Sequence, residues 1–235
     1  MAVAETVTMT QPSLTVVSSK SLADQVADKI VEGIASGALK AGRRIVEAEL
    51  ANELGVSRVP IREALKILHA QGIVAGRPRY GVSVAAYDDR KIVQIYEIRC
   101  AFEKIAIRDA KRNANMPVLL RKLDESIAEM DRCLQRGDLL GVSKADLHFH
   151  HEICRASQND IVLVLWEALS RHMLIVFEQE LLGDAEQASI VDHHRAFRRS
   201  FEELSVDALE AEIEGHIMRL RNVPHQETVA AAQGA

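Results

Sequence analysis

Several features are scarce in this 235-residue chain, and each scarcity excludes a class of protein. The three cysteines are odd in number and form no C-x-x-C pair, so we expect free thiols in a reducing cytoplasm and no disulfide framework. With 5 prolines and 4% aromatic residues, the composition favours helix over sheet. The longest apolar run, IVLVLW at 161–166, is far shorter than the roughly 18–20 residues of a membrane span.

The first residues of the sequence do not predict a signal peptide. The stretch MAVAETVTMTQPSLTVVSSK has neither the basic start nor the apolar block of a signal peptide, and it predicts a disordered leader over 1–20. The last residues have nothing to bury and predict a flexible tail over 223–235. The length between these ends accommodates two modest domains, each with its own core.

A strong positive charge, the usual mark of a nucleic-acid-binding protein, is also missing from the whole chain, whose formal net charge is −5. The charge is unevenly divided. Residues 21–86 contain 9 Lys/Arg and 7 Asp/Glu, whereas residues 88–222 contain 19 and 25. The first part is therefore mildly basic and the second acidic, which indicates two domains with different tasks. Any hypothesis of DNA binding must depend on local positions.

Residues 21–86 predict a compact unit with the order helix, helix, turn, helix and two-stranded wing. Apolar residues at helical spacing mark the helices, while Gly37, Gly55 and Gly72 mark their ends. The stretch LKAGRRIV between the first two helices is expected to be a short extended segment or a turn. The predicted bounds are 21–36, 47–54 and 57–71 for the helices and 73–75 and 82–85 for the strands.

From residue 88 onward no strand pattern is evident, and an all-α bundle is expected. Helices are predicted at about 88–112, 117–136, 138–157, 160–182, 184–204 and 205–222. Each shows apolar residues at three-four spacing, as in the first with Ile92, Ile95, Ile98, Phe102 and Ile105. The predicted fold class is mainly α: an N-terminal winged helix-turn-helix domain at 21–86 with a small β-wing, then a C-terminal helical bundle at 88–222 with about six helices.

The helix-turn-helix segment offers a surface that could read DNA. Arg58 and Arg62 share one face near the start of the second helix, where base edges are usually contacted, and arginine can bond guanine O6 and N7 together. Arginines on an exposed helix face are often merely solvated, but the neighbouring turn and wing favour DNA contact. Phosphate, base and minor-groove contacts are together expected from Arg43, Arg44, Ser57, Arg58, Arg62, Arg77, Arg79 and Gly81.

The stretch KADLHFHHEI at 144–153 concentrates possible metal ligands. Asp146 and His150 are four residues apart, so both side chains lie on one helix face and can hold one ion together. Two ligands make a weak site, and further donors must come from other helices. His194 and His216 fall on the apolar stripes of the fifth and sixth helices and are expected to face inward. A single inward histidine is more often a hydrogen-bonded core residue, so this alternative stays open for each.

The first half of the chain resembles a known family. The stretch GRRIVEAELANELGVSRVPIREALKILHAQGIV, followed by RYGVSV, is similar to the winged helix-turn-helix of GntR-type bacterial transcription regulators. Its LGVSR-x-P-[IV]-REAL core is longer and more specific than a general helix-turn-helix pattern. The resemblance implies that a homodimer binds palindromic, double-stranded operator DNA, with Arg58 and Arg62 in the recognition helix and Gly81 in the wing. Many relatives carry an arginine where this chain has Ala48, so one family contact is expected to be absent.

The second half resembles the FCD effector domain of the FadR-like GntR branch, through IYEIRCAFEKIAIRDAKR, DLHFHHEICRASQND, DHHRAF and EIEGHIMRL. Matched residue by residue, the resemblance implies a divalent metal site made of Asp146, His150, His194 and His216. It also implies that Arg99 grips the carboxylate of an effector; the alternative role for Arg99 is an i,i+4 pair with Glu103. Six bundle helices and the short 85–88 connection resemble the VanR-type subgroup more than the seven-helix FadR type.

Residues and resemblance together predict a cytoplasmic, metabolite-responsive transcription regulator, most often a repressor in this family, controlled by a small organic acid at the metal site. A site of one aspartate and three histidines suits Zn²⁺, Ni²⁺, Mn²⁺ or Fe²⁺, and ligand type alone cannot choose between them. Zn²⁺ is the leading expectation. Two alternatives stay open: a metal-dependent, hydrolase-like enzyme, and an ion with a purely structural role. Against the enzyme, we find no general base beyond weak candidates such as Glu152, and the DNA-reading unit would have no purpose.

Overall fold

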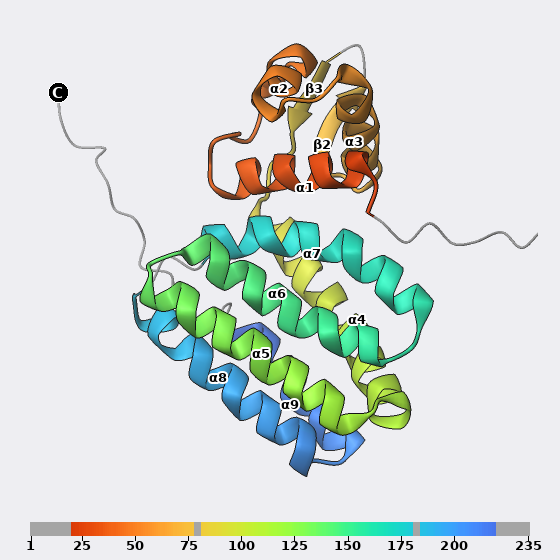
Figure 1. Ribbon diagram of the computed structural model, residues 1–235, viewed down its shortest axis with the longest axis vertical. Coiled ribbons are helices and arrows are strands. Elements are labelled where there is room, and N and C mark those ends of the chain that lie inside the picture. The colour runs from red at the N-terminus through yellow and green to blue at the C-terminus, as the bar shows by residue number, and fades with distance from the viewer. Residues whose placement is uncertain (1–19, 78–80, 181–183, 220–235) are drawn as a thin grey trace, which may run out of the picture.

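The computed structural model describes residues 20–77, 81–180 and 184–219, which form two domains stacked on one another (Figure 1). The predicted fold class is confirmed: a helix-turn-helix with a small sheet precedes a bundle of helices. The predicted tail and the predicted leader, apart from Lys20, lie outside the described residues.

The N-terminal domain, which is the expected DNA-binding domain, has the predicted order of helices with one additional strand. Its helices are α1 (Leu22–Ala35), α2 (Glu47–Leu54) and α3 (Arg58–Ala70), and its strands are β1 (Arg44–Ile45), β2 (Val74–Arg77) and β3 (Gly81–Val84). Strand β3 pairs antiparallel with both β1 and β2. The extended segment predicted before the second helix is therefore part of the sheet, which has three strands in place of the two expected. Gly55 ends α2 with a φ of 65°, a left-handed conformation that suits glycine at a helix end.

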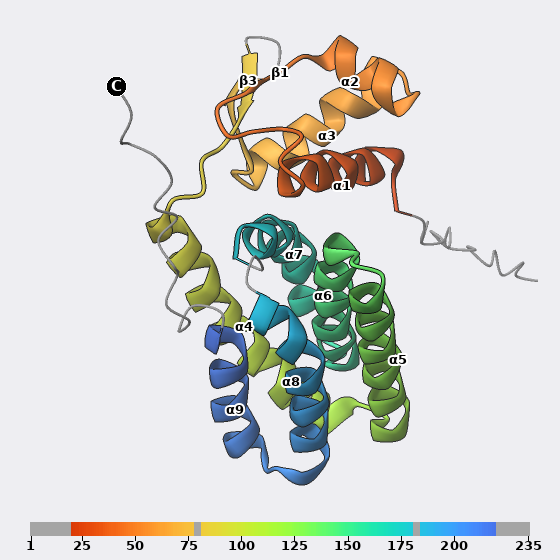
Figure 2. The same ribbon diagram turned by 90° about the vertical axis from the view of Figure 1, so that its left-hand side faces the viewer.

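The C-terminal domain, which is the expected effector domain, contains six described helices, as predicted. They are α4 (Asp89–Asn113), α5 (Met116–Gln135), α6 (Leu139–Ala156), α7 (Asp160–Glu180), α8 (Asp184–Glu203) and α9 (Val206–Met218). Helix α6 packs against α4, α5 and α7, and the pair α8 and α9 closes the bundle against α5 and α4 (Figure 2). Helix α1 of the DNA-binding domain lies along α7, so the two domains share a boundary. Within the described residues, no helix has the length and apolar character that crossing a membrane requires.

Helix α4 buries a different face from the one its isoleucines suggest. Ile92 and Ile95 are buried, but Ile98 and Ile105 are 58% and 43% exposed. The charged residues Arg99 and Glu103 are buried in their place. The three-four spacing therefore predicted the helix correctly, but only the first part of its buried face.

Candidate functional site

Three helices of the effector domain bring the predicted metal ligands together. Helix α6 carries Asp146 and His150, α8 carries His194, and α9 carries His216. One ring nitrogen from each histidine lies within 4.8 Å of those of the other two. Asp146 Oδ1 lies 2.9 Å from Nε2 of His194, and Asp146 Oδ2 lies 4.0 Å from Nε2 of His150. The buried His150 and His194, the half-buried His216 and the Asp146 carboxylate thus surround one point.

Hydrogen bonds on the outer side of two rings determine what faces this point. His194 donates from Nδ1 to the carbonyl of Ile190 at 2.8 Å, because a carbonyl can only accept. His150 donates from Nδ1 to the Glu103 carboxylate at 2.5 Å. When the rings are neutral, Nε2 of each therefore carries a lone pair toward the centre. Both Nε2 atoms and Asp146 Oδ2 are buried without a hydrogen-bond partner.

These acceptors fit a divalent cation. An imidazole lone pair and a carboxylate oxygen repel each other at 2.9 Å unless a proton or a cation lies between them. Ligands at about 2.1 Å from one ion, and at right angles to each other, are separated by about 3 Å. The distance between His194 Nε2 and Asp146 Oδ1 matches this separation. Imidazole nitrogens with one carboxylate, and no thiolate, form a ligand set for Zn²⁺, Ni²⁺, Mn²⁺ or Fe²⁺.

The pKa shifts of His150, His216 and Asp146 favour the protonation states that a metal requires. It lowers the pKa of His150, although the Glu103 charge opposes the shift. The pKa of His216 falls well below its ordinary value, because the ring is buried and lies near His194 and His150. The carboxyl of Asp146 is buried, which opposes ionisation, but the adjacent His194 and His150 hold its pKa below the usual range. Two neutral imidazoles and a charged carboxylate can therefore bind a cation near neutral pH without first losing protons.

Glu103 belongs to the site, although the sequence did not predict it as a site residue. It is fully buried, and its carboxylate accepts hydrogen bonds from Arg99 Nε at 2.6 Å and from His150 Nδ1. Burial opposes ionisation of Glu103, but the adjacent His150 and Arg99 lower its pKa. The R-x-x-x-E spacing signals the pair with Arg99, whereas nothing in the sequence signals the contact with His150. By holding the Nδ1 proton, Glu103 turns His150 Nε2 toward the metal position.

Arg99 lies at the edge of this centre. Its side chain is 2% exposed, Nη2 is 3.7 Å from Asp146 Oδ2, and the guanidinium lies 5.3 Å from the ring of Phe177. The i,i+4 pair with Glu103 that sequence analysis left as the alternative is present in the structure. An effector-binding role for Arg99 stays a prediction.

Three further described histidines, His148, His172 and His193, make their hydrogen bonds outside the cluster. His148 contacts Ser126 at 2.9 Å on the exposed side of α6. His193 is exposed and bonds the carbonyl of Ser189. His172 lies at the domain boundary, where it contacts Tyr87. That these three are surface or supporting residues, and not metal ligands, stays a prediction.

The predicted DNA contacts gather at the start of α3 and along the wing. Ser57 and Arg58 are exposed there, and Arg62 bonds Glu47 through Nε at 2.7 Å with 41% of its side chain exposed. A cleft of about 520 Å³ separates α3 from the wing and is lined by Arg44, Glu47, Arg62 and Gly81, among others. Arg43 is exposed and donates to the carbonyl of Ala38. Arg79 lies outside the described residues, and only the backbone of Arg77 is described.

Comparison with family models identifies both domains. The model for bacterial regulatory proteins of the gntR family matches residues 22–84, and the FCD domain model matches residues 94–219, more than half of the chain. The chain belongs to the GntR family. This GntR-family protein therefore combines a DNA-binding domain with an FCD domain, and it is a transcriptional regulator and not an enzyme. The hydrolase-like alternative is thereby set aside.

Relatives and solved structures agree with this assignment. The GntR-family chain is 31% identical over 191 residues to the probable D-xylose utilization operon transcriptional repressor of Paenarthrobacter nicotinovorans, covering 81% of this chain and 80% of the relative. It is 32% identical over 145 residues to the gluconate operon transcriptional repressor of Bacillus licheniformis, covering 62% and 59%. The structure of Escherichia coli McbR/YncC shares the fold, with a TM-score of 0.74 and 23% identity over 86% of this chain and 95% of that one. Membership of the VanR-type subgroup stays a prediction.

Proposed function

We propose that this regulator is a metabolite-responsive repressor whose affinity for operator DNA changes when a small carboxylate binds beside a divalent metal ion. The observation that carries the proposal is the convergence of the Asp146 carboxylate and three imidazoles at one buried point, next to the guanidinium of Arg99. The names of two relatives, both operon repressors, support repression as the direction of control. A regulator of bacterial genes acts in the cytoplasm, where its operator is.

The metal would be held by Asp146, His150, His194 and His216, with Zn²⁺ as the leading candidate. When bound, the ion supplies positive charge and about one or two coordination positions that an oxygen ligand can fill. Arg99 can hold a carboxylate through two parallel hydrogen bonds while Glu103 keeps the guanidinium in place. Aromatic rings enclose the centre: Phe197 stacks on His216 at 4.8 Å, and Phe149 meets His194 edge-on at 4.9 Å. The bound acid is therefore expected to be small.

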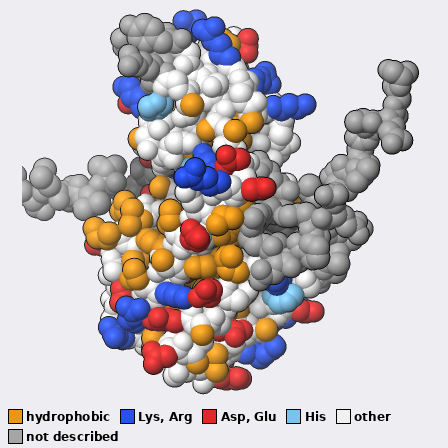
Figure 3. Space-filling view, turned by 180° about the vertical axis from the view of Figure 1, so that it is seen from behind, with side chains coloured by type: hydrophobic (Ala, Val, Ile, Leu, Met, Phe, Trp, Pro, Cys, Tyr) orange, Lys and Arg blue, Asp and Glu red, His pale blue; other side chains and the backbone are white. Residues whose placement is uncertain are grey.

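We propose that the protein is a homodimer, and exposed apolar side chains on the effector domain support this. Ile98 and Ile105 of α4 are joined by residues of α7, which packs against α4. In α7, the exposed apolar residues are Ile161 (71%), Val164 (66%) and Leu165 (53%). Seen from behind the view of Figure 1, hydrophobic side chains gather on the effector domain (Figure 3). A second copy would remove them from water, and two-fold symmetry would present two recognition helices to the half-sites of a palindrome.

Arg58 and Arg62 are proposed to read bases, because they occupy the exposed start of α3. Ser57, Arg43, Arg44 and the wing around Gly81 are proposed to contact phosphates or the minor groove. The Arg62–Glu47 pair would hold the Arg62 side chain in an extended position before DNA arrives. Arg79 lies outside the described residues and stays a predicted DNA contact.

The decisive experiment is a titration of DNA fragments from around the protein's own gene. Binding is measured on metal-loaded and on chelated protein, with and without a panel of small carboxylates. We expect tight, salt-sensitive binding that one acid weakens only when the metal is present. Absence of specific DNA binding under every condition would refute the proposed function.

The same samples test the remaining alternative, a purely structural ion. In that case chelation unfolds the bundle, which circular dichroism detects, and no acid changes DNA binding. With a regulatory site, Arg99→Ala is expected to give a folded protein that still binds DNA but no longer responds to the acid. A folded Arg99→Ala protein with the full response would exclude Arg99 as the carboxylate partner.

A further inference from the structure

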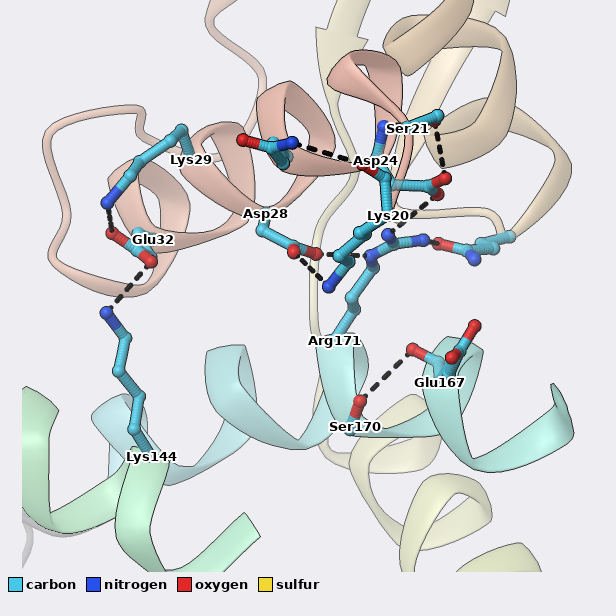
Figure 4. A network of polar contacts seen from close by, with 12 residues as sticks. Lys20, Ser21, Asp24, Asp28, Lys29, Glu32, Lys144, Glu167, Ser170 and Arg171 are labelled. Carbon is cyan, nitrogen blue, oxygen red and sulfur yellow. Dashed lines mark hydrogen bonds and ion pairs between the residues drawn. The ribbon is translucent and has the colours of Figure 1, made fainter. Parts of the chain in front are cut away.

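Arg171 of α7 is a buried arginine whose hydrogen-bond partners lie in the DNA-binding domain. Only 8% of its side chain is exposed. It donates from Nε to Asp28 at 2.9 Å, from Nη2 to Asp24 at 3.3 Å and from Nη1 to Gln71 Oε1 at 3.4 Å (Figure 4). Asp24 and Asp28 belong to α1, and Gln71 ends the recognition helix α3. Because a guanidinium presents several donors in one rigid plane, this single side chain links α7 to two helices of the other domain.

The next residue along α7 reinforces this contact. His172 donates from Nε2 to the carbonyl of Gln71 at 2.9 Å, and its Nδ1 accepts from the hydroxyl of Tyr87 at 2.8 Å. One donor and one acceptor describe a neutral ring, and burial lowers the pKa of His172 accordingly. Lys91 at the start of α4 donates to the adjacent carbonyl of Gly72 at 3.0 Å. Both the side chain and the backbone at the end of α3 are therefore held by the effector domain.

The helices that make these contacts also contact the metal centre. Phe177 of α7 lies under Arg99, and Trp166 of the same helix has its ring 6.2 Å from that of His150. In α6, Lys144 stands two residues before Asp146 and pairs with Glu32 of α1 at 2.8 Å (Figure 4). A packed helix moves as a rigid element, so a shift of α7 at the metal centre changes the position of its partners on α1 and α3.

We propose that Arg171 is the positioning residue that fixes the recognition helix relative to the effector domain, and that Gln71 is where a change at the metal centre reaches α3. The part of this inference that concerns signalling rests on the proposed function. The polar boundary between α7 and the DNA-binding domain suits transmission of a change, because its ion pairs and single hydrogen bonds can exchange with water and re-form. A large apolar boundary would instead hold the two domains in one arrangement. A lysine at position 171 would keep the charge but could not reach both aspartates and Gln71 in one plane.

Distances between the domains test the positioning role without any ligand for the site. Dyes are attached to the full-length protein at Val59→Cys in α3 and Val118→Cys in α5, both exposed sites, while the three natural cysteines are buried. Single-molecule energy transfer is recorded with one labelled subunit per dimer. The unsubstituted protein is expected to give one narrow distribution of transfer efficiency. The distribution should be broad for Arg171→Ala and of intermediate width for Arg171→Lys.

Arg198→Ala is the matched control, because Arg198 joins α8 to Asp124 of α5 inside the effector domain, away from the boundary. It removes the same kind of side chain and is expected to keep the narrow distribution. A narrow, unchanged distribution in Arg171→Ala would overturn the proposal, whatever the protein does with DNA.

Operator affinity with Zn²⁺ alone as the probe tests the signalling role. Zn²⁺ is expected to change the operator affinity of the unsubstituted protein and of Arg198→Ala by a factor within the usual range of about 5–150. In Arg171→Ala this factor should fall to about twofold or less, while the affinity for Zn²⁺ itself stays the same. A full factor in Arg171→Ala would refute the signalling role. If DNA binding by the unsubstituted protein ignores both Zn²⁺ and carboxylates, the proposed function fails, and the measured distances still decide whether Arg171 positions the helix.

Discussion

Replacement of Glu103 by glutamine is expected to weaken both the metal centre and the bundle. The carboxylate accepts hydrogen bonds from Arg99 Nε at 2.6 Å and from His150 Nδ1 at 2.5 Å, and it is fully buried. Glutamine keeps the shape but removes the charge, and its amide NH₂ would face one of these two donors. One hydrogen bond is lost, and among the described residues Asp146 is then the one carboxylate within ion-pair distance of the buried Arg99.

The magnitude follows from these contacts. Removing one partner of a buried ion pair costs about 3–5 kcal/mol in unfolding free energy. Asp146 lies 3.7 Å from the Arg99 guanidinium and retains part of the compensation, so we expect about 3 kcal/mol in the metal-free protein. Loss of the acceptor that orients His150 is expected to weaken Zn²⁺ binding by about 10–100-fold. This factor corresponds to about 1.4–2.8 kcal/mol in binding free energy.

Two assays separate the effects. Urea unfolding of the chelated protein gives the stability, and competition with a chromophoric chelator gives the affinity for Zn²⁺. Glu129→Gln is the control, because it removes the same charge from an exposed ion pair with Arg132 on α5. If Glu103→Gln behaves like this control in both assays, Glu103 does not orient His150 and the reasoning is wrong.

Three further predictions concern DNA, assembly and pH. Arg62→Ala is expected to cost about 1–3 kcal/mol in operator binding and to relax the preference for one base. Arg43→Ala should weaken binding to every sequence and reduce by about one the slope of log affinity against log salt concentration. Competition between operator variants at several salt concentrations distinguishes the two effects. Ile98→Glu is expected to dissociate the proposed dimer, because burial of this side chain between two copies would contribute about 1.5–3 kcal/mol per copy. Val118→Glu, comparably exposed on α5, should leave sedimentation unchanged. The unfolding free energy of the chelated protein is expected to fall as the pH drops below about 6.5. Burial lowers the pKa of His172 in the folded state, so the unfolded chain takes up the proton first. Urea titrations between about pH 5 and 8 measure this free energy, and a value that does not change with pH would contradict the prediction.

Local periodicity explains what the sequence predicted well. Helical spacing alone places Asp146 and His150 on one face, and apolar neighbours place His194 and His216 inward. The structure brings all four together as expected. The order of the helices was equally predictable, since glycine and capping residues mark the ends of most segments.

Contacts between distant segments explain the features that the sequence did not predict. Arg171 and Asp28 are 143 residues apart, and no spacing rule relates two such positions. The contact of Glu103 with His150 crosses between helices in the same way, and strand β1 is defined only by its pairing with β3. In α4 the apolar spacing misled, because a functional centre buries Arg99 and Glu103 where a simple core would bury isoleucine. The exposed Ile98 and Ile105 then have a different role, which we propose to be assembly.

The measurement that tests the central claim most directly is reciprocity between the two sites. Coupling between two ligands must act equally in both directions. The carboxylate identified in the operator titration is titrated by calorimetry into Zn²⁺-loaded protein, first alone and then with saturating operator DNA. We expect the operator to weaken binding of the acid by the same factor by which the acid weakens binding of the operator. An affinity for the acid that the operator leaves unchanged would contradict control of DNA binding by the buried metal centre.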